Sequence, residues 1–235
     1  MVDFTGGTWR SLVDGAEISA IPDIGDYQWY ADEGEGTTLN ANIGDVDMTV
    51  STSDAWVSDT NSIGGVHLNF GEDDQANTNS EVTHDSFTAF GWHRPEDIDG
   101  VMMEFGPYNN VDNGLLLRLE SEGFTLTTGD GSNFNNDLSE VGSVETGSWY
   151  FASITFDDSL DEQLRLIIWD ESELLLDKTT DTSYFGEGSN EFTMGSPSGG
   201  DRVTNSGDYD FYGYEEGSVL EKPDLEELWE ATNAR

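Results

Sequence analysis

The stretch Trp149-Tyr-Phe-Ala-Ser-Ile-Thr-Phe156 decides the fold class of this 235-residue chain. It is rich in aromatic and β-branched residues, which favour strands. Its even-numbered members, from Tyr150 to Phe156, fall on one face of an extended chain, because strand side chains alternate between two faces. The stretch therefore predicts a β-strand that turns one face to a core.

The same character recurs along the chain in short segments, separated by clusters of Gly, Asn and Asp. These segments are Phe87–Trp92, Val101–Phe105, Leu115–Leu119, Phe124–Thr128 and Gln163–Trp169. The turn clusters between them lie at 107–114, 129–137 and 157–161. Many short strands with such turns predict an all-β fold, a sandwich of two packed antiparallel sheets.

Residues 223–232 break this pattern. Pro223 stands near the first helical position, acidic residues follow it, and Leu225, Leu228 and Trp229 share one face at helical spacing. We expect a short C-terminal helix that closes the domain.

The first 25 residues form a separate arm in our interpretation, and residues 26–235 form a single sandwich. The arm has too few elements for a core of its own, so its apolar side chains need a surface to pack on. We expect it to dock onto another subunit or to support a homo-oligomer. The predicted interface residues are Trp9, Leu12, Val13, Ile18 and Ile21.

Charge dominates the composition, with 8 Lys+Arg against 49 Asp+Glu and a formal net charge of −41. Nucleic-acid binding depends on Lys and Arg that release counterions, so nucleic acid is excluded as a partner, and anionic membranes are excluded for the same reason. The 7 Trp, 8 Tyr and 12 Phe indicate a folded chain despite this charge. Molar salt screens such self-repulsion, which favours a protein from a halophile. An acidic surface protein of a mesophile is the alternative.

Other function classes are limited by what the sequence lacks. With 0 Cys, it has no disulfide framework and no thiolate site. Its first residues show no basic region followed by an apolar stretch, and no run approaches 18 apolar residues. We therefore expect no recognisable secretory route and no membrane insertion.

Several segments, taken in order, resemble LamG-like jelly-roll domains of the concanavalin A-like superfamily. They are Tyr27–Leu39, Ala55–Val57, Gly64–Gly71, Phe87–Trp92, Thr146–Phe156, Leu164–Trp169, Phe192–Gly195, Tyr209–Tyr214 and Leu225–Leu228. The resemblance implies a two-sheet jelly roll that binds glycans or proteins, often with a calcium ion at its rim. Residues 168–171 lack the glycine that the family has after this strand, so we expect a rebuilt turn there.

The arm, from Trp9 to Asp23, resembles a prefix on structural proteins of tailed viruses of halophilic archaea. This resemblance implies a virion component that is assembled in the host cytoplasm and released with the particle.

The sequence offers no arrangement typical of an enzyme. A Glu-x-Asp-x-Glu strand, which β-glucan hydrolases of the superfamily carry, is absent, and His67, His84 and His93 are scattered. The acidic clusters at 96–99 and 157–162 contain turn-type residues and are better explained as solvated loops. We expect a protein without catalytic activity.

Two kinds of binding site remain possible. Calcium prefers oxygen ligands from loops, and Asp130, Asn136 and Asp137 offer them, although a hydrophilic turn explains the same residues. Glycans need aromatic faces and amide partners, because sugar rings stack and their hydroxyls hydrogen-bond. The predicted glycan-binding residues are Tyr108, Asn109, Asn133, Phe134 and Asn135. Aromatic residues that only anchor these loops to the sandwich are the alternative.

Our leading hypothesis is a non-enzymatic protein at the virion surface of a halophilic archaeal virus, as a capsid decoration, turret or tail fibre. Its partners are other virion proteins and a host glycan or glycoprotein. A cellular carbohydrate-binding module of a halophile is the second hypothesis, and a glycoside hydrolase is the third.

Overall fold

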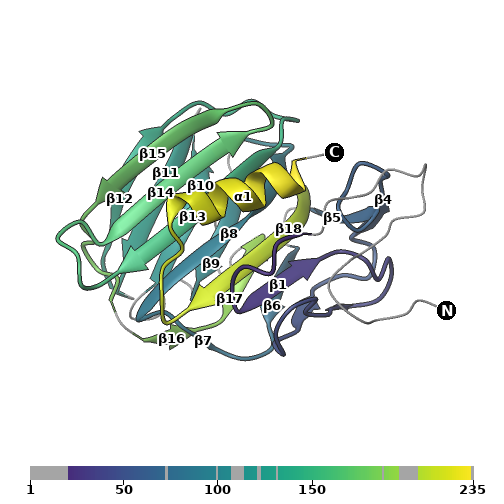
Figure 1. Ribbon diagram of the computed structural model, residues 1–235, viewed down its shortest axis with the longest axis horizontal. Coiled ribbons are helices and arrows are strands. Elements are labelled where there is room, and N and C mark those ends of the chain that lie inside the picture. Colours follow the sequence, from purple (N-terminus) through teal and green to yellow (C-terminus); the bar gives the residue numbers. More distant parts are fainter. Residues whose placement is uncertain are drawn as a thin grey trace.

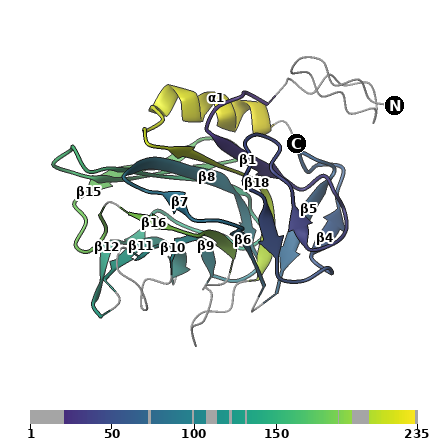
Figure 2. The same ribbon diagram turned by 90° about the horizontal axis from the view of Figure 1, so that it is seen from below.

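The computed structural model describes residues 21–71, 74–98, 100–106, 114–120, 123–130, 132–186, 188–195 and 206–233. Two antiparallel sheets pack face to face, and one helix lies on the outside of the first (Figure 1, Figure 2). The predicted fold, an antiparallel two-sheet sandwich with a C-terminal helix, is confirmed. No helix in the described part is long and apolar enough to cross a membrane.

Each sheet has a defined spatial order of hydrogen-bonded strands. The first sheet runs β15 (Leu174–Thr180), β14 (Leu164–Asp170), β13 (Tyr150–Asp157), β8 (Ser86–Pro95), β18 (Gly207–Glu216), β5 (Val66–Phe70) and β4 (Trp56–Ser58), and β1 (Tyr27–Tyr30) also pairs with β18. The second runs β12 (Phe134–Val141), β11 (Gly123–Gly129), β10 (Gly114–Glu120), β9 (Val101–Phe105), β17 (Phe192–Gly195), β6 (Gln75–Thr78), β3 (Met48–Val50) and β2 (Thr38–Leu39). A small ladder joins β7 (Val82–Thr83) to β16 (Ser189–Asn190).

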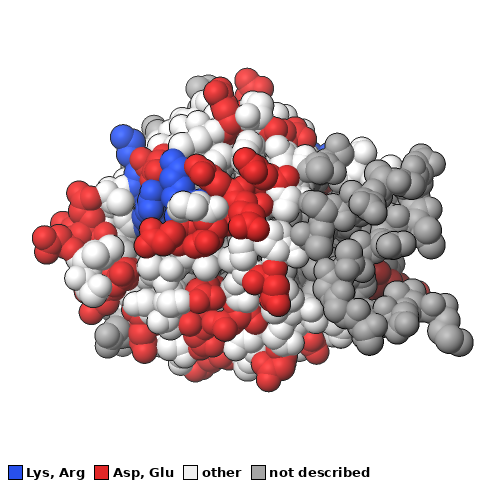
Figure 3. Space-filling view, viewed as in Figure 1, with Lys and Arg blue, Asp and Glu red and all other residues white. Residues whose placement is uncertain are grey.

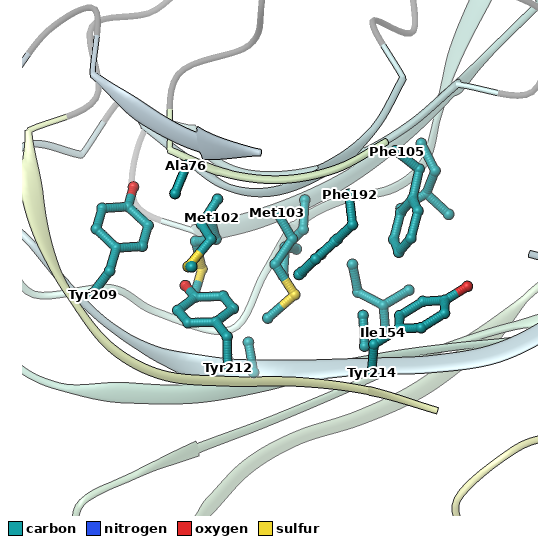
Figure 4. Packing of buried hydrophobic residues seen from close by; sticks show 14 of the residues in the cluster. Ala76, Met102, Met103, Phe105, Ile154, Phe192, Tyr209, Tyr212 and Tyr214 are labelled. Atoms are coloured by element: carbon teal, nitrogen blue, oxygen red, sulfur yellow. The ribbon is translucent and has the colours of Figure 1, made fainter. Parts of the chain in front are cut away.

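The main core lies between the two sheets. Tyr150 to Phe156 alternate as predicted, since the even-numbered side chains are in this core while Phe151 faces the other side of the sheet. Three buried tyrosines of β18, Tyr209, Tyr212 and Tyr214, point toward methionine and phenylalanine side chains of β9 and β17 (Figure 4). These aromatic side chains of β18 therefore serve packing between the two sheets.

Helix α1 (Lys222–Thr232) covers the outer face of the first sheet and creates a second apolar layer. Leu225 and Leu228 are fully buried there. Two tryptophans fix the helix, because Trp92 Nε1 donates to Thr232 Oγ1 at 2.7 Å and Trp229 Nε1 donates to the Asp170 carbonyl at 2.8 Å. The predicted amphipathic helix is thus confirmed.

Lys and Arg are few on the face that carries α1, and Figure 3 shows them gathered in one place among many acidic side chains. Arg165 of β14 binds the Asp177 carboxylate through Nε at 2.8 Å, and Lys222 reaches the same carboxylate at 3.1 Å. This pairing ties the start of α1 to the β14–β15 hairpin.

Residues 21–25 lie against the sandwich. Ile21 and Ile24 pack on the apolar layer under α1. Gln28 Nε2 donates to the carbonyls of Pro22 at 2.8 Å and Ile24 at 2.7 Å. Of the predicted interface residues, Ile21 thus contacts the domain itself. Trp9, Leu12, Val13 and Ile18 lie outside the described residues.

Candidate functional site

One edge of the second sheet is β12, and it carries four of the predicted ligand and metal residues: Phe134, Asn135, Asn136 and Asp137. The sequence predicted a turn over 129–137, but the chain has already entered the strand at Phe134, which pairs with Gly129 of β11. The turn is shorter because one carboxylate closes it: Asp130 Oδ1 accepts from the backbone N–H of Ser132 at 2.9 Å and of Asn133 at 2.6 Å. The predicted loop is therefore largely a strand edge.

Phe134 is the most accessible aromatic side chain of this edge, with 54% of its surface exposed. Among the large exposed hydrophobic residues of the described part it is the one aromatic. Its register partner in β11 is Gly129, which has no side chain. A flat apolar ring at a sheet edge is the surface on which a sugar ring stacks.

Asn135 lies beside this ring in sequence and is held in place by hydrogen bonds. Its Nδ2 donates to Asp137 Oδ1 at 2.8 Å and to Ser183 Oγ at 2.9 Å. Asn133 Nδ2 in turn donates to Asp130 Oδ2 at 3.1 Å. Because both amide groups are fixed by neighbours, their orientation is set before any ligand arrives, which reduces the entropy lost on binding.

Asn133, Phe134 and Asn135 of the predicted glycan-binding set follow one another along this edge, and by strand alternation the Phe134 and Asn135 side chains lie on opposite faces of the sheet. Tyr108 and Asn109, the other two members, lie outside the described residues.

A continuous row of side chains crosses the outer face of the second sheet, one partner after another. It runs Asn136, Thr127, Leu116, Glu104, Thr193, Asn77, Thr49 and Thr38. Its sequence neighbours, such as Leu117 and Met194, lie in the core, which places the row on the outside. Its centre, from Thr127 to Thr193, is buried. A ligand therefore finds accessible side chains only toward the ends of the row, one of which is β12.

The predicted calcium ligands are largely engaged with the protein. Asn136 Oδ1 accepts from Thr127 Oγ1 at 2.8 Å, and Asp137 accepts from Thr128 and Ser183. Hydrogen bonds from Asn133, and then from Ser132, lower the pKa of Asp130. Within the described ranges, no group of three or more His, Cys, Asp or Glu is placed to hold a metal. Calcium at these residues stays a prediction.

A buried polar cluster on β18 was missed by sequence reasoning. His67 Nε2 lies 2.9 Å from Asp208 Oδ1, and Arg94 Nε donates to the other carboxylate oxygen at 2.6 Å. Ser62 Oγ lies 3.0 Å from His67 Nδ1. The Arg94 guanidinium also lies over the Trp149 ring, 4.9 Å from its centroid. One signal was visible in the sequence: Asp208 alternates with aromatic residues inside a strand, where a charge needs a partner.

The Ser62–His67–Asp208 chain has the residue types of a hydrolytic triad, but its bonds join two parts of the fold. We call this group of residues the Asp208 clamp. Ser62 is only 7% exposed, and Asp208 shares its charge with Arg94. Asp210 accepts from the backbone N–H of Ile63 at 3.1 Å. Together these bonds hold the turn before β5 against β18.

The Asp208 clamp predicts a specific response to acid. Burial by itself raises the pKa of a carboxyl group, but hydrogen bonds from His67, Asn69 and Arg94 lower the pKa of Asp208 to about 2. A folded-state pKa below the ordinary value stabilises the protein at neutral pH, and this stability is lost as the pH falls from about 4 toward 2. We expect the contribution to be about 1–2 kcal/mol.

The measurement is urea unfolding of the wild-type protein and of Asp208→Asn at pH 6 and pH 2.5. The wild-type protein should be the more stable at pH 6, and the gap should shrink at pH 2.5. An equal gap at both pH values would show that ionisation of Asp208 does not matter.

Comparisons with known proteins address the fold. Neither a scan against protein-family models nor a search of the curated proteins finds a match for this chain. Solved structures do match it over most of its length.

Three of these structures come from different kinds of protein. Trypanosoma rangeli sialidase in complex with sialic acid matches with a TM-score of 0.60 and 14% identity over 90% of this chain and 33% of its own. Domain 4 of a GH43 extracellular arabinanase from Geobacillus stearothermophilus, in complex with arabinotriose, matches with a TM-score of 0.60 and 11% identity over 88% of this chain and 97% of its own. Botulinum neurotoxin type C, whose cell entry depends on interaction with two ganglioside molecules, also matches. Its TM-score is 0.57 and its identity 14%, over 88% of this chain and 51% of its own.

This chain therefore spans about a third of the sialidase structure, at 33%, and about half of the toxin structure, at 51%. At these identities the likeness shows the β-sandwich fold alone.

Proposed function

We propose that this protein is a non-enzymatic glycan-binding module and that the β12 edge, defined as residues 130–137, is its binding surface. The observation that carries the proposal is the Phe134 ring, 54% exposed at the sheet edge, with the side-chain amides of its chain neighbours Asn133 and Asn135 held in place by hydrogen bonds. The ring offers stacking and the amide oxygens offer hydrogen bonds, which are the two contacts that a sugar requires.

The ligands of the three structurally similar proteins support the proposal. The sialidase was seen with sialic acid, the arabinanase domain with arabinotriose, and the toxin interacts with gangliosides. All three ligands are carbohydrates or carry them.

A location at the virion surface of a halophilic archaeal virus is part of this proposal. The net charge of −41 and the resemblance of the arm to virion proteins support it. Mass spectrometry of purified virions tests it directly, since the chain must be present in the particle. The second candidate is a cellular carbohydrate-binding module, which the match to 97% of a single arabinanase domain favours.

The glycan-binding proposal is tested with a glycan array in molar salt. Phe134→Ala should weaken binding at least about tenfold, because loss of one stacked ring removes roughly 1.5 kcal/mol or more. Leu160→Ala is the matched control, since Leu160 is equally exposed, at 55%, in the β13–β14 turn. Both variants should melt like the wild-type protein. Full binding by the Phe134 variant would rule out this edge, and absence of any glycan ligand would overturn the proposed function.

The N-terminal arm is proposed as a docking or oligomerisation device. Residues 21–25 pack on the sandwich, so the variant to make lacks only residues 1–20. We expect it to stay folded and to lose assembly, as measured by light scattering with size-exclusion chromatography. An unchanged oligomeric state would show that the arm has no such role.

A further inference from the structure

A pocket of about 370 Å³ lies at the end of the first sheet, away from the β12 edge. One wall is the loop that leads into β13, with Glu145, Trp149 and Tyr150, and the opposite wall is the β14–β15 turn, with Asp170 and Glu171. Three serine residues and one leucine complete the lining. The pocket thus combines aromatic and aliphatic surface with carboxylate and hydroxyl oxygens.

Hydrogen bonds hold both walls in place. On the loop side, Tyr150 Oη accepts from the Glu145 backbone N–H at 2.7 Å. On the turn side, Asp170 Oδ1 accepts from the backbone N–H of Ser172 at 2.6 Å and of Glu173 at 2.8 Å. Helix α1 supports this turn through Trp229 Nε1, which donates to the Asp170 carbonyl at 2.8 Å. The pocket is therefore formed before a ligand enters, as small-molecule sites usually are.

The charge of the pocket is strongly one-sided. In the described part, Arg94, Arg118, Arg165 and Lys222 form ion pairs with Asp208, Glu120 and Asp177, and none of these ion pairs includes a carboxylate of the pocket. Burial of Asp170 opposes its ionisation, but hydrogen bonds from Ser172 and Glu173 lower its pKa, which keeps it charged near neutral pH. A cation is thus the ligand that this charge favours.

The size and the walls argue for an organic cation. In the described part, no group of three or more acidic or histidine side chains is placed to hold a metal ion. Rings and a leucine line the pocket beside the carboxylates, so an aliphatic stem finds apolar contact while its charged end finds oxygen acceptors. The Arg94 guanidinium already lies over the Trp149 ring, 4.9 Å from its centroid, and its charge is paired with Asp208.

We propose that this pocket binds a primary ammonium group on an aliphatic stem, the chemistry that a lysine side chain and a small diamine share. The site is separate from the β12 edge, so the proposal does not depend on glycan binding.

The test is an NMR titration of the full-length protein, followed at the indole N–H signal of Trp149, in 1 M NaCl. This salt concentration screens the general attraction of cations to an acidic surface. n-Butylammonium should shift the signal with a saturating curve in the millimolar range, and n-butanol, its neutral counterpart, should not. No shift with n-butylammonium, or an equal shift with n-butanol, would overturn the proposal.

Charge variants separate the pocket from the surface as a whole. Glu145→Gln with Glu171→Gln should weaken n-butylammonium binding at least fivefold. Asp158→Asn with Asp161→Asn removes the same number of charges in the turn at the opposite end of β13 and β14 and should leave binding unchanged. Equal weakening in both pairs would show non-specific attraction and contradict the proposal. Titrations with Nα-acetyl-lysine amide and with 1,4-diaminobutane then distinguish the two sources of the ammonium group.

Discussion

In dilute buffer at neutral pH, the protein should lose its fixed tertiary packing and regain it as NaCl approaches about 1 M, where the Debye length falls to about 3 Å. The net charge is −41, and in the described part Lys and Arg form ion pairs with only three carboxylate groups, those of Asp208, Glu120 and Asp177. Most of the repulsion is therefore left to the solvent to screen. We expect the melting midpoint to rise by about 10 °C or more between 0.1 and 3 M NaCl.

The measurement is near-UV circular dichroism during heating, because that signal reports fixed aromatic packing. Sucrose is the matched control, since it strengthens burial by exclusion from the surface but screens no charge. Recovery in NaCl and not in sucrose supports screening. A melting curve that is the same at both salt concentrations would contradict the proposal of a halophilic protein.

Replacing the two buried leucines of α1 should have the largest effect of any conservative change to the helix. Leu225→Ala with Leu228→Ala removes side chains that are fully buried against the first sheet. Each such truncation costs about 2–5 kcal/mol, so the pair should cost about 4–10 kcal/mol. Domains of this kind are stable by only about 5–15 kcal/mol, and the variant should therefore be partly unfolded at room temperature.

Urea unfolding in 3 M NaCl measures this effect, because urea carries no charge. Glu226→Ala with Glu227→Ala is the control on the exposed side of the same helix, and it should stay within about 0.5 kcal/mol of the wild-type protein. A loss below about 1 kcal/mol in the leucine variant would mean that α1 does not hold the sandwich together.

Periodicity predicted the regular elements well, because burial on one face imposes it. The strand predicted at Val101–Phe105 has those bounds in β9, and the predicted helix begins one residue earlier, at Lys222. In the helix, Leu225 and Leu228 face the core as the spacing predicts, whereas in β9 a bulge puts both Met102 and Met103 in the main core and leaves Val101 packed on Leu116 outside it.

The candidate site was predicted only in part. Asn133, Phe134 and Asn135 follow one another along the β12 edge, but the turn predicted to contain them proved to be largely a strand edge, since hydrogen bonds to β11 outweigh the turn preference of Asn and Asp. The pairing of His67 with Asp208 was not predictable, because β5 and β18 lie far apart in sequence and meet only in the sheet. The row on the outer face of the second sheet depends on register, which sequence patterns do not fix across eight strands.

The most direct test of glycan binding at the β12 edge is to map a bound glycan by NMR in molar salt. With a glycan selected on the array, the side-chain amide signals of Asn133 and Asn135 and the ring signals of Phe134 should shift most. Signals of the Trp149 pocket should stay in place, because that pocket lies at a different part of the fold. Shifts centred anywhere other than residues 130–137 would contradict the assignment of the β12 edge as the glycan-binding surface.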